Sequence, residues 1–160
     1  MKRLLVLFAV VANLVLADAV TKELAAGYLK DAAAISVIPE FFNLAYVENR
    51  GCAWGPLQGQ VWPLAVFGLV ALAFLIWKRT SVFNLQPSTF NLTAVAEPLL
   101  YAGIIGNVID RLFRGYVIDM LDFHWGVHHF PCFNVADSLI CIAVGLMLLS
   151  SFSAKSSTPT

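Results

Sequence analysis

The chain has 160 residues, of which 59% are apolar and only 12% are charged. A soluble domain carries about 25% charged residues, and twenty charges cannot give a folded chain of this length a polar surface. Basic and acidic side chains balance at ten each, which excludes the basic face of a nucleic-acid-binding protein. The composition predicts a membrane protein, in which every remaining charge is a candidate functional group.

Four apolar segments are about as long as the shortest helices that span a bilayer, namely 4–20, 61–77, 92–109 and 135–152. Only a helix satisfies its own backbone in lipid, so we predict four transmembrane helices. The first segment has an alternative interpretation, because Lys2-Arg3, the apolar run and Ala17-Asp18-Ala19 also fit a cleavable signal peptide. The other three segments would still place the chain in the membrane.

Charge placement predicts the orientation of these spans. An even number of spans puts both termini on one side, and the basic residues there stand apart from acids: Lys2, Arg3, Lys78, Arg79 and Lys155. We therefore expect both termini to be cytoplasmic. Nine of the ten acidic residues fall at or beyond the outer ends of the spans, so the outer loops 21–60 and 112–134 hold most of the polar chemistry. The tail 153–160 is expected to be disordered.

The first outer loop contains two β-prone stretches, 35–38 and 41–47. Pro39 and Asn49-Arg50-Gly51 bound them, which predicts a small strand pair lying on the membrane surface. In the helix before it, Asp18 and Lys22 are four residues apart and can pair on one face. Either a snorkelling lysine at a helix end or a functional pair fits that spacing.

Another polar cluster lies at the C-terminal end of the segment 92–109. Asn107 and Asp110 are three residues apart and share a helix face, whereas Arg111 points elsewhere and can reach another carboxylate or a lipid phosphate. Asn134 opens the last span as a candidate N-cap, with Asp137 in the first turn, where the helix dipole favours a negative charge.

Asp119 stands in an apolar run with no neutralising neighbour, and the short loop 112–134 must bring it towards Asp137. Two carboxylates that share a site do not both ionise easily, so one pKa rises. One member can then take a proton from water while the other protonates the departing group. This pairing predicts aspartic-peptidase chemistry, which needs no metal or other cofactor.

Metal and thiol sites are alternatives to the carboxylate pair. His124, His128 and His129 lie near Asp119 and Asp122, but no His-Glu-x-x-His motif is present. A thiol nucleophile would lack a placed base, although Cys52 and Cys132 could form a disulfide in an oxidising compartment. On the residues alone, a proton or ion transporter that uses Asp110, Asp119 and Asp137, and a membrane protein that docks a partner, also remain open.

Taken together, the motifs resemble bacterial lipoprotein signal peptidase (signal peptidase II) over about residues 4–152. They are Asp18-x-x-Thr21-Lys22, Asn49-Arg50-Gly51, Gly106-Asn107-x-x-Asp110-Arg111, Gly115-x-Val117-x-Asp119 and Phe133-Asn134-x-Ala136-Asp137, in that order. The resemblance implies an all-α integral membrane protein of four transmembrane helices with a small extracytoplasmic β cradle. It also implies a monomeric enzyme of the bacterial inner membrane whose active site is at the outer face.

The implied activity is intramembrane aspartic endoproteolysis, which removes the signal peptide from a prolipoprotein just before a diacylglyceryl-modified cysteine. Asp119 and Asp137 match the catalytic pair. The resemblance gives supporting or substrate-binding roles to Asn107, Asp110, Arg111, Asn134, Asn49, Arg50, Asp18 and Lys22. It implies no metal, and it names lipid-modified prolipoproteins and membrane phospholipid as partners.

Overall fold

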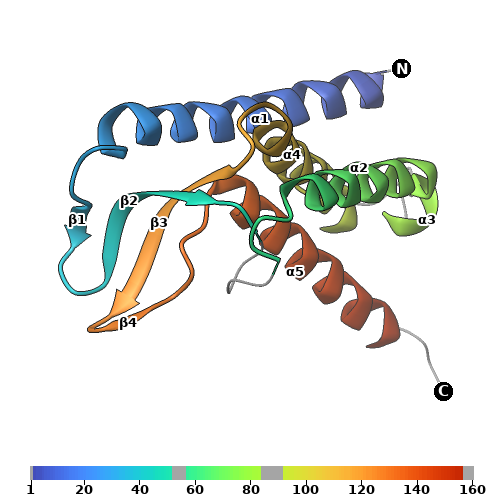
Figure 1. Cartoon of the computed structure of the whole chain (residues 1–160). Helices are drawn as coiled ribbons and strands as arrows, with labels where there is room; N and C mark the ends of the chain where they lie inside the picture. The colour runs from blue at the N-terminus through green and yellow to red at the C-terminus, as the bar shows by residue number, and fades with distance from the viewer. Residues whose placement is uncertain (1, 52–56, 84–91, 157–160) are drawn as a thin grey trace.

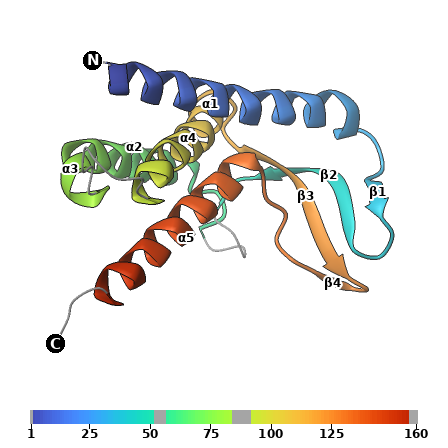
Figure 2. The same ribbon diagram turned by 180° about the vertical axis from the view of Figure 1, so that it is seen from behind.

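A bundle of long helices carries a small sheet at one end in this computed structural model, which describes residues 2–51, 57–83 and 92–156. The long helices are α1 (Lys2–Leu29), α2 (Val61–Trp77), α4 (Leu92–Phe113) and α5 (Val135–Ser156). The start of α1 and the end of α5 lie away from the sheet (Figure 1), as the reverse view also shows (Figure 2). Because of the sheet, the predicted class "all-α" is too narrow.

Within the described residues, three helices are long and apolar enough to cross a membrane: α1, α4 and the part of α5 up to Phe152. The fourth, α2, is apolar but has 17 residues, and its bounds coincide with the predicted segment 61–77. The first helix continues to Leu29, well past residue 20, because the chain after Asp18 is rich in helix formers. The last helix continues through Ser156 into the predicted tail, and residues 157–160 lie outside the described part.

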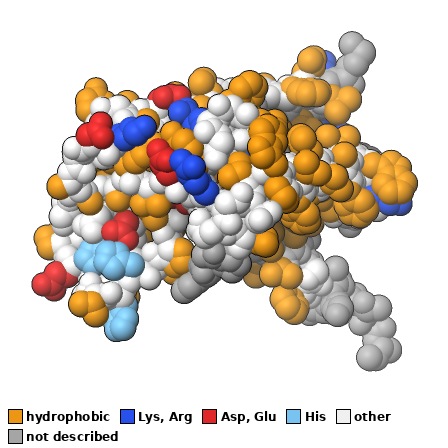
Figure 3. Space-filling model, viewed as in Figure 1, with side chains coloured by type: hydrophobic (Ala, Val, Ile, Leu, Met, Phe, Trp, Pro, Cys, Tyr) orange, Lys and Arg blue, Asp and Glu red, His pale blue; other side chains and the backbone are white. Residues whose placement is uncertain are grey.

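The helices expose large apolar side chains over most of their outward surface. Leu5 and Phe8 of α1 and Phe67 and Trp77 of α2 are more than 60% exposed, and only 6% of the most apolar window of α1 is buried. In the space-filling view, hydrophobic side chains cover the helical end, while charged side chains and histidines gather over the sheet end (Figure 3). A surface of this kind is suited to lipid rather than water.

Helix α4 is the centre of the bundle, because it contacts α1, α2 and α5. Small residues allow these contacts. A Cβ on Gly103 would lie 2.5 Å from the Ala136 carbonyl oxygen of α5, and a Cβ on Gly68 of α2 would lie 2.5 Å from Val108. Close approach at small residues is the usual way in which membrane helices pack.

The sheet is antiparallel, in the order β1 (Ile35–Ile38), β2 (Phe42–Asn49), β3 (Val117–Trp125) and β4 (His128–His129). The predicted strand pair over 35–47 is confirmed as β1 and β2. The outer loop 112–134 was not predicted to supply strands, yet β3 is the longest of the sheet. Its pairing places Asn49 opposite Val117 and Val47 opposite Asp119, which brings the two outer loops into contact.

At the end away from the sheet, the short helix α3 (Arg79–Val82) follows α2. Arg79 forms an ion pair with Glu97 of α4, a carboxylate that is almost fully buried. The pair connects α3 to α4 at the end of the bundle opposite the sheet (Figure 1).

Candidate functional site

Asp119 is a buried carboxylate in β3, just after the turn that Gly115 makes with φ +76° at the end of α4. Both of its oxygens accept hydrogen bonds from side-chain amides. Asn49 of β2 donates to Oδ2 at 2.9 Å, and Asn134 donates to Oδ1 at 2.7 Å. The sheet and the start of α5 therefore hold this carboxyl group from two sides.

Asp137 lies in the first turn of α5 and completes a reciprocal cap with Asn134. The Asn134 side-chain oxygen accepts a hydrogen bond of 2.9 Å from the backbone N–H of Asp137. In return, the backbone N–H of Asn134 donates to the Asp137 carboxylate at 3.2 Å. This is the N-cap predicted from the sequence. The Asp137 carboxylate also accepts a hydrogen bond of 2.7 Å from Asn107 of α4.

Two amides join the two carboxylates. Asn134 donates to Asp119 and also to the Asn107 side-chain oxygen, at 3.2 Å. Since its own oxygen is taken by the Asp137 N–H, Asn134 can only present its NH₂ group to Asp119. The helix cap thus determines which atom of Asn134 faces the buried acid.

Lys22 sets the orientation of the other amide. Its ammonium group is 1% exposed and donates to the Asn107 oxygen at 3.2 Å. A lysine has donors only, so Asn107 must turn its oxygen to Lys22 and its NH₂ group to Asp137. Lys22 therefore determines which atom of Asn107 faces Asp137.

The charge of Lys22 is compensated by two carboxylates, Asp18 at 2.8 Å and Asp110 at 3.0 Å. The predicted i, i+4 pair of Asp18 and Lys22 is therefore formed, and it is buried. Asp110 also accepts a hydrogen bond of 3.0 Å from Arg114 and one from the Ile118 N–H. Buried ions need such partners, because an unpaired one costs several kcal/mol.

Asp18 also reaches α5, where its second oxygen accepts the Ala136 N–H at 2.8 Å. Gly106 of α4 makes room for it, since a Cβ there would lie 2.5 Å from an Asp18 oxygen. A carboxylate at a helix N-terminus is stabilised by the free N–H groups and the helix dipole. Asp18 therefore aligns α5, and with it Asp137, against α1 and α4.

The two predicted arginines have different positions. Arg111 donates to the backbone carbonyls of Asn107 and Gly51, both at 3.3 Å, and so holds the end of β2 against α4. Arg50 is 59% exposed and pairs with Glu48 at 3.1 Å, at the edge of the cluster. Arg114, which pairs with Asp110 and Glu23, was missed, although its i, i+4 spacing from Asp110 was a usable signal.

A cavity of about 500 Å³ opens beside Asp137. Its lining combines polar and apolar side chains, among them Asn49, Asn107, Arg111, Asp137 and Ser138, and Val117, Phe133, Ile140 and Cys141. Its size is within the range of small-ligand pockets. An extended peptide with apolar side chains could lie here within reach of the carboxylate.

The surroundings of Asp119 change its affinity for a proton. Burial and, after it, the negative charge of Asp137 raise the pKa of Asp119 to about 7, against the opposing hydrogen bonds from Asn49 and Asn134. Asp119 is thus able to hold a proton near neutral pH. The Asp137 carboxylate accepts hydrogen bonds from the Asn107 side chain and from the Asn134 backbone N–H at the start of α5. The two carboxyl groups thus interact electrostatically and share Asn134 as a hydrogen-bond partner.

The geometry gives little support to the metal site and the thiol nucleophile that the sequence left as alternatives. Among the described residues, no three His, Cys, Asp or Glu side chains form a group that could hold a metal ion. His129 instead lies 2.8 Å from Asp122 and stacks on His124. Burial, followed by the charge of Asp119, raises the pKa of the Cys132 thiol to about 12, which makes it a poor nucleophile. Cys52, the other half of the suggested disulfide, lies outside the described residues.

Residues 10–153 match the sequence model of a family described as signal peptidase (SPase) II. The lipoprotein signal peptidase of Syntrophotalea carbinolica is 42% identical over 146 residues, which cover 89% of this chain and 88% of that protein. That of Vibrio cholerae is 40% identical over 128 residues, covering 79% and 73%. A solved bacterial membrane enzyme superposes with a TM-score of 0.82 at 31% identity, covering 96% of this chain and 92% of its own.

Proposed function

The chain belongs to the signal peptidase II family, and from this we propose that it is an aspartic endopeptidase that cuts prolipoproteins before a lipid-modified cysteine. The observation that carries the catalytic assignment is the pair of acids held by Asn107 and Asn134. One is buried with a pKa of about 7, and the other accepts N–H donors at a helix start. We assign Asp119 and Asp137 as the catalytic residues.

In the proposed reaction, one acid takes a proton from water and the other gives a proton to the leaving group. Ionised Asp137 takes a proton from water, and the resulting hydroxide adds to the carbonyl carbon of the scissile peptide bond. Protonated Asp119 then gives its proton to the departing nitrogen as the C–N bond breaks. A proton passes from Asp137 back to Asp119, and the pair is ready for another cycle.

Asn107, Asn134 and Asn49 act on this chemistry by holding the two carboxyl groups. Lys22 orients Asn107, and its charge is in turn neutralised by Asp18 and Asp110. Arg111 holds the strand end that faces the cavity. The burial of Lys22, Asp18 and Asp110 supports a positioning role for these three, whereas Asn49, Asn107 and Arg111 line the cavity and can also contact the peptide. The cavity beside Asp137 offers apolar side chains to the substrate and polar groups to its backbone.

The proposed membrane placement uses all four long helices as spans, with α2 at the lower length limit of about 17 residues. Lys2 and Arg3 at the start of α1 and Arg79 after α2 lie at the end away from the sheet, and basic residues favour the cytoplasm. Both termini would then be cytoplasmic, and the sheet would cover the outer face of the inner membrane. A lipid-modified cysteine keeps its acyl chains in the bilayer, so its peptide bond lies at the depth of the two acids. We propose that the enzyme acts as a monomer.

The test is cleavage of a lipid-modified precursor by purified enzyme in phospholipid nanodiscs. Asp119→Asn and Asp137→Asn should each abolish cleavage while the protein still inserts and unfolds cooperatively on heating. Asp122→Asn is the matched control, since Asp122 is on the same strand but bonds to Asn43 and His129 instead. Near-wild-type turnover in either of the first two variants, or a loss of equal size in the control, would refute the assignment.

A further inference from the structure

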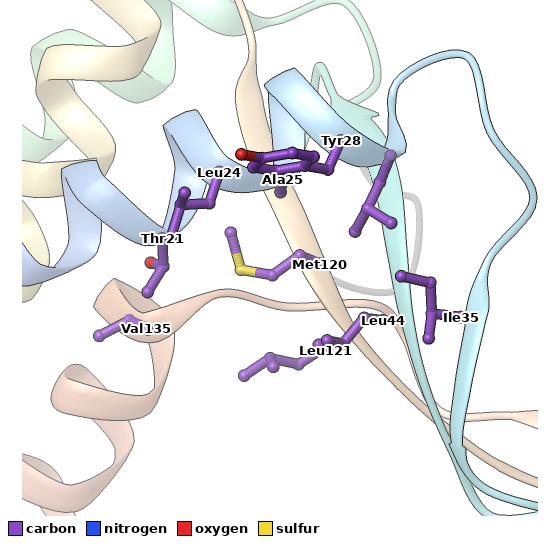
Figure 4. Close-up of a pocket in the computed structure, with 10 residues that line it drawn as sticks. Thr21, Leu24, Ala25, Tyr28, Ile35, Leu44, Met120, Leu121 and Val135 are labelled. Carbon is purple, nitrogen blue, oxygen red and sulfur yellow. The ribbon is translucent and has the colours of Figure 1, made fainter.

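A second cavity, of about 360 Å³, lies between the last turns of α1, three strands and the start of α5. Leu24, Ala25 and Tyr28 form its wall on the helix side, and Leu44, Met120 and Leu121 form it on the sheet side (Figure 4). It shares no lining residue with the cavity beside Asp137. The proposed peptidase reaction does not use it.

The wall of this cavity has almost no hydrogen-bonding capacity. Thr21, one of its few polar residues, already donates its hydroxyl proton to the Asp18 carbonyl at 2.8 Å. A water molecule needs two to four polar partners to remain in a cavity, and apolar cavities stay dry or take apolar ligands. The cavity is therefore suited to a hydrocarbon ligand and not to water.

The length of α1 places the cavity at membrane depth. Its 28 residues extend about 42 Å, more than the roughly 30 Å of bilayer hydrocarbon. Counted from Leu4, after the two basic residues, about twenty residues fill the hydrocarbon and reach Leu24. The cavity therefore opens where the hydrocarbon meets the headgroups.

An exposed apolar stripe leads along α1 to this opening. Leu16, Val20, Leu24 and Tyr28 follow one another at four-residue spacing, and all four side chains are exposed. Residues at this spacing lie on one helix face. The lipid-facing surface of α1 thus continues without a polar break into the cavity wall.

We propose that this cavity binds one acyl chain of a membrane phospholipid, taken from the leaflet next to the sheet. The chain would fill the space between α1 and the sheet and so fix the sheet, with Asp119 in it, relative to the bundle. Phospholipid is favoured over the lipid of the substrate because the cavity is separate from the one at Asp137, where the scissile bond would lie.

The test uses the full chain in nanodiscs of phosphatidylethanolamine and phosphatidylglycerol that contain a trace of phosphatidylglycerol with a diazirine at the end of one acyl chain. After illumination, mass spectrometry locates the label. We expect label on the strand residues Leu44, Met120 and Leu121 as well as on the exposed face of α1. Label on α1 alone would overturn the proposal.

Ala25→Phe fills the cavity, and Val20→Phe adds the same ring to the stripe outside it. The first should lower strand labelling at least fivefold, and the second should leave it unchanged. Leu44→Phe, which fills the cavity from the sheet, replaces Ala25→Phe if that variant does not fold. Unchanged strand labelling in a folded, filled variant, or displacement of the label by an excess of diacylglyceryl-modified peptide, would refute phospholipid as the occupant.

Discussion

The pKa of Asp119 makes the proposed mechanism sensitive to pH in a definite direction. Burial and the nearby Asp137 charge raise it from 3.8 to about 7, and the mechanism needs Asp119 protonated. Below this pKa the acid holds its proton; above it, the protonated fraction falls tenfold per pH unit. We therefore expect kcat/KM for a lipid-modified precursor to fall with a midpoint near pH 7.

Asn49→Ala should move this alkaline limb upward. Asn49 donates a hydrogen bond of 2.9 Å to the Asp119 carboxyl group, and such a bond stabilises a charged acceptor by about 1.5–3 kcal/mol. Since one pKa unit corresponds to about 1.4 kcal/mol, its loss should raise the pKa by roughly one to two units. The enzyme would then remain active at more alkaline pH, even where its maximal rate is lower.

The assay is a pH series of initial cleavage rates in nanodiscs, at a substrate concentration well below KM. Asn43→Ala is the matched control, because Asn43 is on the same strand and donates at 3.1 Å to Asp122 instead. The control should keep the wild-type midpoint. A wild-type profile that stays flat to pH 9, or a midpoint in Asn49→Ala that is unchanged or lower, would refute the assignment of Asp119 as the proton donor.

Three further results are expected. Lys22→Met should cost about 3–5 kcal/mol of unfolding free energy, because it leaves buried carboxylates unpaired. Adding Asp18→Asn should recover part of this stability in thermal unfolding. It should not recover the turnover, since Asn107 would still lack its orienting partner. Gly106→Ala should cost about 1–3 kcal/mol, because its Cβ would meet Asp18, whereas Gly27→Ala, with nothing within 4 Å, should gain about 0.5–1 kcal/mol; equal melting temperatures would contradict this. EDTA should leave the cleavage rate unchanged, and inhibition reversed by added metal would speak against a reaction of two carboxylates alone.

Local physics explains what could be predicted from the sequence. Apolar runs and the scarcity of charge predict a membrane protein, and α2, the starts of α4 and α5, and the pair β1–β2 appear where the pattern placed them. The cap at Asn134 and the pair Asp18–Lys22 could also be predicted, since both depend on residues three or four positions apart. Such features need only the period of a helix or the preference of a turn.

Only the tertiary structure decided how these pieces meet. Lys22 orients Asn107 across 85 positions, and Asp18 caps α5 across 118. No local pattern encodes such contacts, and Gly106 permits one of them only because two helices approach closely there. The strand β3 was missed because its pairing with β2, more than 65 residues away, determines it. The sequence alone thus indicates a membrane protein, a family resemblance, and Asp119 and Asp137 as its candidate pair. The burial of Asp119, its raised pKa, and the network that joins it to Asp137 come from the packing of α1, α4, α5 and the sheet.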